Sequence, residues 1–184
     1  MTRLTLRTLD NAPADSRPFV EKAIASNGYL PNLIGVLANA PVALEAYLTV
    51  AGINGRASLT LAEREAVQIT AARIHGCDFC VAGHTAVALK KAAEPLDVVR
   101  ALQQGSATGK PRIDAVVAFT RAVIARRGAV DDADYQAFTA GGYNEQQALE
   151  VVLGVSLATL CNFANSLAGT PVNPELTPYL PGTL

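Results

Sequence analysis

The chain has 184 residues and a formal net charge of −1; half of its residues are hydrophobic and 17% are charged. This length and apolar content suit one compact domain with a substantial core. The near-zero charge gives no general attraction to nucleic acid or to anionic lipid, so neither partner is expected. The first seven residues, 1–7, are too short and too polar for a secretory leader, so we expect a cytoplasmic protein.

The predicted elements are all helices, because alanine and leucine are abundant and no segment alternates as a strand does. About ten residues form an extended arm before them. Proline in the first turn, where its missing N–H costs nothing, begins each of the first three helices. Gly28 ends the first of them. These helices are predicted at residues 17–26, 31–39 and 41–52.

The next two predicted helices carry the residues of chemical interest. Thr60 and Glu63 have the spacing of a capping box, which predicts a helix over 61–75. Gly76 then supplies the left-handed residue that ends a helix. A second helix is predicted directly after it, over 77–91.

The rest of the chain completes a single all-α domain over 1–184. The apolar stretch 151–170 is long enough for a membrane span, but five polar side chains interrupt it. We therefore expect a buried core or subunit-contact helix there, and no membrane partner. The tail 170–184 holds four prolines and is expected to be extended, reaching across a neighbouring subunit. The later helices are predicted at residues 95–103, 112–127, 132–140 and 145–168.

A pair of cysteines stands at the start of the second of these central helices. Cys77 and Cys80 lie three residues apart, so they are neighbours on one helix face. The first turn of a helix favours an anion, which makes the reactive thiolate easier to form. His84 follows Cys80 by four residues on the same stripe, within reach as a proton acceptor. With three cysteines and no export signal, redox or metal chemistry is favoured over a structural disulfide.

A carboxylate on the preceding helix completes the constellation. Glu65 lies on a stripe of apolar residues, whereas Arg64 and Gln68 mark the opposite face, which we expect to be in solvent. A buried carboxylate needs a partner, because burying it alone is costly. The reversal at Gly76 would bring Glu65 to His84, where it orients or stabilises the imidazole, directly or through a water.

Glu65, Cys77, Cys80 and His84 together resemble the signature of the alkylhydroperoxidase D and carboxymuconolactone decarboxylase superfamily. The flanking sequences are similar too, and the resemblance covers about residues 28–90. It implies an all-helical homo-oligomer, a trimer or a hexamer, with alkylhydroperoxidase-type activity. It further implies that Cys80 is the peroxidatic thiol and Cys77 the resolving thiol, and that Glu65 and His84 relay the proton that Cys80 loses.

One position departs from the pattern. Alkylhydroperoxidase D proper carries a histidine immediately before the later cysteine, where this chain has Phe79. This points to a broader peroxidase-related branch and leaves any particular protein reductant unassigned. The decarboxylase branch generally lacks the cysteine pair, so its chemistry is not expected here.

The chemistry of the pair agrees with the resemblance. A Cys80 thiolate attacks hydrogen peroxide or an organic hydroperoxide and becomes a sulfenic acid, which Cys77 converts to a disulfide with release of water. An external dithiol or thiol protein then restores the pair. No flavin, haem or nucleotide motif is present in the sequence, so no cofactor is expected.

Two other classes of function stay open at this point. Cys77, Cys80 and His84 could hold a metal, with Glu65 or His75 as a fourth ligand, although structural zinc usually draws on two separated pairs. Alternatively, the protein is a non-catalytic oligomeric scaffold whose cysteines sense redox state. Outside the constellation, Cys161 is expected to be a packed thiol, His75 a helix-end group and Phe163 a core residue, and no role is assigned to Asn162 and Asn165.

Overall fold

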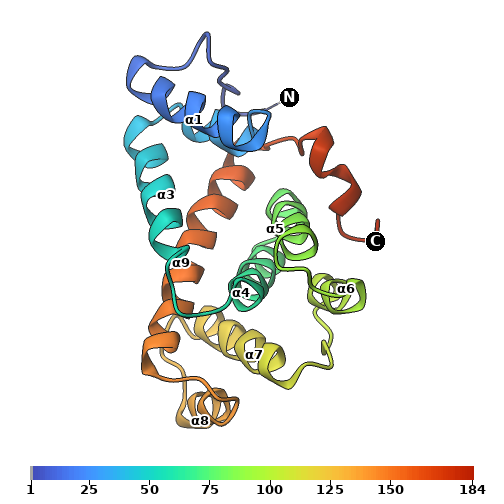
Figure 1. Cartoon of the computed structure of the whole chain (residues 1–184). Helices are drawn as coiled ribbons and strands as arrows, with labels where there is room; N and C mark the ends of the chain where they lie inside the picture. Colours follow the sequence, from blue (N-terminus) through green and yellow to red (C-terminus); the bar gives the residue numbers. More distant parts are fainter. Residues whose placement is uncertain (1) are drawn as a thin grey trace.

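The computed structural model describes residues 2–184, and within them every regular element is a helix (Figure 1). The predicted helices are all present, most with ends within two residues of the expected ones. In chain order they are η1 (Ala14–Ser16), α1 (Arg17–Asn27), α2 (Asn32–Leu37), α3 (Pro41–Asn54), α4 (Leu61–Ile74), α5 (Asp78–Lys90), α6 (Leu96–Gln104), α7 (Pro111–Ala125), α8 (Asp132–Ala140), α9 (Glu145–Ala168) and η2 (Pro174–Tyr179).

Helix α4 lies at the centre of the fold, in contact with α5, α6, α7 and α9. The long α9 runs along the molecule, with α3 beside it and α4 and α5 on its other side (Figure 1). Buried hydrophobic side chains form two clusters. One gathers residues of α1 to α3, α5 and the second half of α9, and it contains all three cysteines. The other joins α4 to α6, α7, α8 and the first half of α9.

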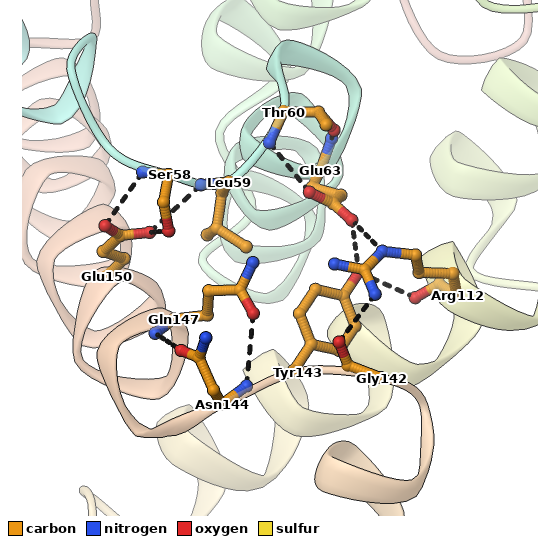
Figure 2. Close-up of polar contacts among 10 residues, drawn as sticks. All are labelled: Ser58, Leu59, Thr60, Glu63, Arg112, Gly142, Tyr143, Asn144, Gln147 and Glu150. Atoms are coloured by element: carbon orange, nitrogen blue, oxygen red, sulfur yellow. Dashed lines mark hydrogen bonds and ion pairs between the residues drawn. The ribbon is translucent and has the colours of Figure 1, made fainter.

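The start of α4 is fixed by a polar network, shown in Figure 2. The capping box forms as predicted, with Thr60 and Glu63 each accepting the backbone N–H of the other. The second oxygen of Glu63 also accepts from Arg112 of α7 at 2.6 Å and from the Tyr143 hydroxyl at 3.0 Å. Because Glu63 is only 2% exposed, these donors replace the water that its carboxylate loses. They anchor the helix that carries Glu65.

Removing the charge of Glu63 is expected to destabilise the fold by about 2 kcal/mol, the usual value for hydrogen bonds to a charged group. Burial alone would raise the pKa of Glu63, but the donors of Thr60, Arg112 and Tyr143 outweigh it and hold the pKa below its usual value. This stabilisation is therefore complete above the unfolded pKa of about 4.3 and is lost as the pH falls through the lower folded value. Urea unfolding of wild type and Glu63→Gln at neutral and acidic pH measures it. The difference between the two proteins should shrink on acidification; a constant difference contradicts the assignment.

Helix α9 is a core helix of this fold. It is long and apolar enough to cross a membrane by length and composition, as the sequence indicated, but it packs against α2, α3, α4, α5 and α7. Its polar residues Asn162 and Asn165 are buried within these contacts. Phe163, which we expected in the core, is instead 56% exposed, with its ring against His75 at the end of α4. Three other apolar side chains of α9 are also exposed: Leu149, Val152 and Leu167.

The C-terminal segment departs from the expectation of an extended arm. Residues 174–179 form the 3-10 helix η2, which packs against α5 of the same chain. Leu176 is buried in the cluster that holds the thiols, and the side chain of Asn173 bonds the backbone of Leu30 and Asn32. The four prolines thus fit a short tight helix and its flanks, and the segment closes over its own subunit.

Candidate functional site

The α4–α5 hairpin brings Glu65 and His84 together. Gly76 has a φ of 70°, in the left-handed region that glycine adopts without strain, and reverses the chain between the two helices. Glu65 is buried, and its Oε2 lies 2.7 Å from Nδ1 of His84. The imidazole is 31% exposed in its side chain, so it connects a buried carboxylate to more open space. The opposite face of α4 is not in solvent as expected: Gln68 is 3% exposed and donates to the carbonyl of Gly154 in α9.

The two thiols of the pair lie against each other at the first turn of α5. Cys77 is the N-cap residue, and its sulfur accepts the backbone N–H of Cys80 at 3.4 Å. The two Sγ atoms are 2.8 Å apart, and both cysteines are free and buried. A bonded sulfur pair would be about 2.05 Å apart. The reduced pair is therefore positioned to close into a disulfide.

A third helix contributes a residue that the sequence did not identify as part of the site. The Nδ2 of Asn165, on α9, lies 3.2 Å from the sulfur of Cys80 and 3.7 Å from that of Cys77. Asn165 is 4% exposed, and its Oδ1 is buried without a hydrogen-bond partner within residues 2–184. A polar side chain buried in the apolar stretch of α9 was the only signal for it, and 85 residues separate it from Cys80.

The electrostatics of the pair place negative charge first on Cys77. The thiol hydrogen bond with Cys80 lowers the pKa of Cys77 most, and burial opposes it; the N–H of Cys80 and the Asn165 amide add to the lowering, giving a pKa of about 7. The same hydrogen bond, together with burial, raises the pKa of Cys80. The reduced pair therefore holds one shared proton near neutral pH, with a thiolate available at Cys77.

Replacing Asn165 with alanine is expected to raise the pKa of Cys77 toward the ordinary cysteine value of about 8.5, because the thiolate loses a donor. The rate of alkylation by iodoacetamide, followed against pH and assigned to Cys77 by mass spectrometry, measures this pKa. Asn162→Ala, on the same helix but bonded to His75, is the matched control and should leave the pKa unchanged. An identical titration curve for Asn165→Ala would show that the amide does not act on the thiolate.

The pKa of His84 is shifted in the opposite direction to that of Cys77. Burial favours its neutral form, but the charge and the hydrogen bond of Glu65 outweigh this and raise the pKa of His84. The contact with Glu65 thus makes His84 a stronger base and stabilises the imidazolium once His84 has accepted a proton. No hydrogen bond joins His84 to either sulfur in the described chain, so a proton passing between them would need a water or a substrate oxygen.

Each cysteine of the pair lines a different cavity. Cys80, His84 and Glu65 line a large one of about 1100 Å³, together with Tyr47 and Cys161. Cys77 and Asn165 line a small one of about 290 Å³ at the junction of α5 and the end of α9. Phe79, at the position where alkylhydroperoxidase D has histidine, lines both.

The remaining candidates have simpler surroundings. Cys161 is buried, as expected of a packed thiol, and burial raises its pKa to about 12. His75 ends α4, and its Nδ1 lies 3.0 Å from the Asn162 amide. Within residues 2–184, no group of three or more histidine, cysteine and acidic side chains is arranged to hold a metal ion. The structure therefore does not bring Cys77, Cys80 and His84 together as a ligand set.

The all-helical fold is that of an alkylhydroperoxidase D-like domain. Residues 41–122 match the carboxymuconolactone decarboxylase family. This match covers a little less than half of the chain, and the fold of the whole chain is similar to that of alkylhydroperoxidase D-like proteins. No curated protein sequence matches the chain.

Solved structures with the same fold extend over nearly the whole chain. A peroxidase-related protein with an alkylhydroperoxidase AhpD core, from Ralstonia eutropha JMP134, is 23% identical with a TM-score of 0.86, covering 100% of this chain and 97% of that chain. A peroxidase-related protein from Silicibacter sp. TM1040 is 20% identical with a TM-score of 0.82, covering 95% and 93%. The debrominase Bmp8, as a cysteine-to-alanine variant in complex with 2,3,4-tribromopyrrole, is 17% identical with a TM-score of 0.78, covering 96% and 94%.

Proposed function

We propose that the protein is a cytoplasmic thiol-dependent peroxidase that reduces an organic hydroperoxide through Cys80 and Cys77. The observation that carries the proposal is the large cavity, which is lined both by Cys80 and by the hydrogen-bonded pair of Glu65 and His84. Apolar and aromatic side chains line much of it, and its volume exceeds the need of hydrogen peroxide. An organic hydroperoxide therefore fits the cavity better.

The oxidative half-reaction uses the residues in the order that the resemblance implies. His84 accepts the proton of Cys80 through a water or the substrate, and Glu65 stabilises the imidazolium. The Cys80 thiolate attacks the terminal oxygen of the hydroperoxide, the O–O bond breaks, and Cys80 becomes a sulfenic acid. The imidazolium returns its proton to the departing alkoxide, which leaves as an alcohol.

The second half of the cycle forms and reduces a disulfide. The Cys77 thiolate attacks the sulfur of Cys80, the S–O bond breaks, and the oxygen leaves as hydroxide, which takes up a proton from solvent to become water. The low pKa of Cys77 favours this step, because the thiolate is the nucleophile. Two electrons and two protons from an external dithiol or thiol protein then restore the pair, with no cofactor.

A steady-state assay with cumene hydroperoxide and dithiothreitol tests the proposal on the wild-type protein. We expect alcohol formation with multiple turnovers and loss of two free thiols per chain when the reductant is omitted. Oxidation of the thiols without turnover would instead support the redox-sensing scaffold, and stoichiometric zinc in protein purified without added metal would support the metal-binding module. Hydrogen peroxide as a second substrate distinguishes the two classes of peroxide; we expect it to be the poorer one.

A second candidate is reductive dehalogenation, in which the same pair supplies two electrons to a halogenated aromatic compound. The observations that favour it are the size of the large cavity and the shared fold with the debrominase Bmp8. Adding 2,3,4-tribromopyrrole in place of the hydroperoxide tests it. Release of bromide at a rate above that of peroxide reduction would make this the preferred function.

Self-association is the remaining part of the proposal. Four exposed apolar side chains of α9 provide a surface that a second subunit would cover: Leu149, Val152, Phe163 and Leu167. We expect a homo-oligomer, a trimer or a hexamer, and light scattering after size-exclusion chromatography measures its mass.

A further inference from the structure

The small cavity beside Cys77 has the features of a binding site in its own right. Cys77 lines this cavity and Cys80 lines the large one, so the two cysteines border different spaces. The proposed function fills the large cavity with the hydroperoxide. It leaves the small one, at about 290 Å³, without an assigned ligand.

Two residues that line the small cavity carry a buried side-chain oxygen without a hydrogen-bond partner in residues 2–184. These atoms are the Oδ1 of Asn165 and the Oγ1 of Thr170, and the chain has no other buried side-chain nitrogen or oxygen of this kind in the described part. Leaving a buried polar group unpaired costs about 1–3 kcal/mol. Both oxygens are therefore acceptors that still need a donor, such as an N–H group.

The other walls of the cavity favour a thiolate ligand that carries no further negative charge. The cavity opens at the first turn of α5, whose backbone N–H groups carry positive partial charge. Gly76 and Gly169 border it, and a Cβ at either would meet nothing within 4 Å, so both leave open space. Asp78 is exposed on the rim and disfavours an additional negative charge on the ligand.

We propose that the small cavity binds the cysteine residue of a thiol reductant, whose peptide N–H donates to the Oδ1 of Asn165 and whose thiolate attacks the sulfur of Cys77. The proposal rests on the proposed function, because it needs the Cys77–Cys80 disulfide. A bond forms between the reductant sulfur and Cys77, the disulfide breaks, and Cys80 leaves as a thiolate that takes up a proton. A second reductant thiol then attacks the mixed disulfide, releasing the oxidised reductant and the Cys77 thiolate.

The Asn165 amide serves both ends of this exchange. Its Oδ1 receives the incoming N–H, while its Nδ2, 3.2 Å from the sulfur of Cys80, stabilises the departing thiolate. The chemistry recognised is a neutral cysteinyl amide, which either a small peptide thiol or a cysteine on a protein surface supplies.

The first test separates the two cavities by filling them one at a time. The disulfide is formed with diamide and verified by mass, so the result does not depend on peroxide turnover, and its reduction by N-acetylcysteine amide is followed. Ser166→Trp, which fills the small cavity, should slow this reduction by roughly tenfold or more, as expected when a reacting group is displaced. Its matched control is Ser106→Trp, the same substitution at an exposed position that lines neither cavity.

The reverse variant is Gly83→Leu, one turn from Cys80 in the large cavity. It should slow oxidation of the thiols by cumene hydroperoxide and leave their reduction unchanged. Slower reduction in Gly83→Leu together with normal reduction in Ser166→Trp would overturn the proposal. Failure of peroxide oxidation in the wild type, with reduction still sensitive to Ser166→Trp, would remove the proposed function but keep the thiol site.

The second test examines the peptide N–H of the reductant. It does not depend on whether Ser166→Trp folds. N-acetylcysteine amide is compared with 3-mercaptopropionamide, which keeps the thiol and one amide but lacks the peptide N–H on the cysteine Cα. The wild-type preference for the first probe should fall about fivefold in Asn165→Leu, the value of one hydrogen bond. The substitution also removes the donor that stabilises the Cys80 thiolate. This slows reduction by both probes equally and therefore cancels in the ratio of their rates. An unchanged preference overturns the assignment of Oδ1.

The sources of the cysteine are distinguished by adding reduced thioredoxin as a cysteine-presenting protein. Faster reduction by thioredoxin than by the small amide, again lost in Ser166→Trp, assigns the site to a protein thiol. Faster reduction by the amide, with the same loss, assigns it to a small thiol. Reduction by either that is indifferent to Ser166→Trp counts against the site.

Discussion

Replacing Cys80 with serine is expected to lower hydroperoxide turnover by on the order of a thousandfold or more, because the attacking nucleophile is lost. Cys77→Ser should also abolish steady-state turnover, since no disulfide forms. The two variants should differ in a single turnover, however. Cys77→Ser still consumes one equivalent of hydroperoxide and accumulates a sulfenic acid on Cys80, whereas Cys80→Ser consumes none. Rapid mixing with cumene hydroperoxide, followed by trapping with dimedone and mass spectrometry, measures both.

This experiment decides between two features of the site that point to different sulfurs. Cys80 lines the large cavity with Glu65 and His84, whereas the lower pKa belongs to Cys77. A dimedone adduct on Cys77 in the Cys80→Ser variant would reverse the roles and make Cys77 the peroxidatic thiol. Cys161→Ser is the matched control, since its buried thiol lines the same cavity as Cys80 but has a pKa raised to about 12. It should retain wild-type turnover.

The part of the site that follows helical periodicity could be predicted from the sequence. Cys77, Cys80 and His84 are neighbours along one face of α5, and the capping box at Thr60 and the glycine at 76 gave the ends of α4. A hairpin of two such helices leaves few ways to place Glu65, so its contact with His84 was expected and is present in the structure. Local rules were sufficient because all four residues lie within one hairpin.

Contacts between distant segments could not be predicted in this way. Asn165 reaches the sulfurs only because α9 crosses the start of α5, and no local pattern fixes that crossing. For the same reason Gln68 was assigned to solvent: α4 is buried on almost every side, so its polar residues bond to other helices instead of water. The tail was misjudged because proline predicts where a chain cannot be an ordinary helix, and not what it packs against.

Glu65→Gln is expected to move the alkaline limb of the pH–rate profile to lower pH. In the wild type, Glu65 raises the pKa of His84 against the effect of burial, so the imidazolium that protonates the leaving alkoxide persists to higher pH. Glutamine keeps a hydrogen-bonding group beside Nδ1 but removes the charge, so the pKa of His84 falls and burial then dominates.

His84→Ala tests the same proton relay at the imidazole. It should lower turnover by roughly a hundredfold to ten-thousandfold, the usual contribution of a positioned acid or base, and abolish the alkaline limb altogether. The double variant should then be no slower than His84→Ala alone, because Glu65 acts through the imidazole that it bonds at 2.7 Å. Additive losses would instead mean that Glu65 contacts the hydroperoxide directly from the wall of the large cavity. Measuring kcat/KM for cumene hydroperoxide across the pH range in all four proteins separates a relay of two residues from two independent groups.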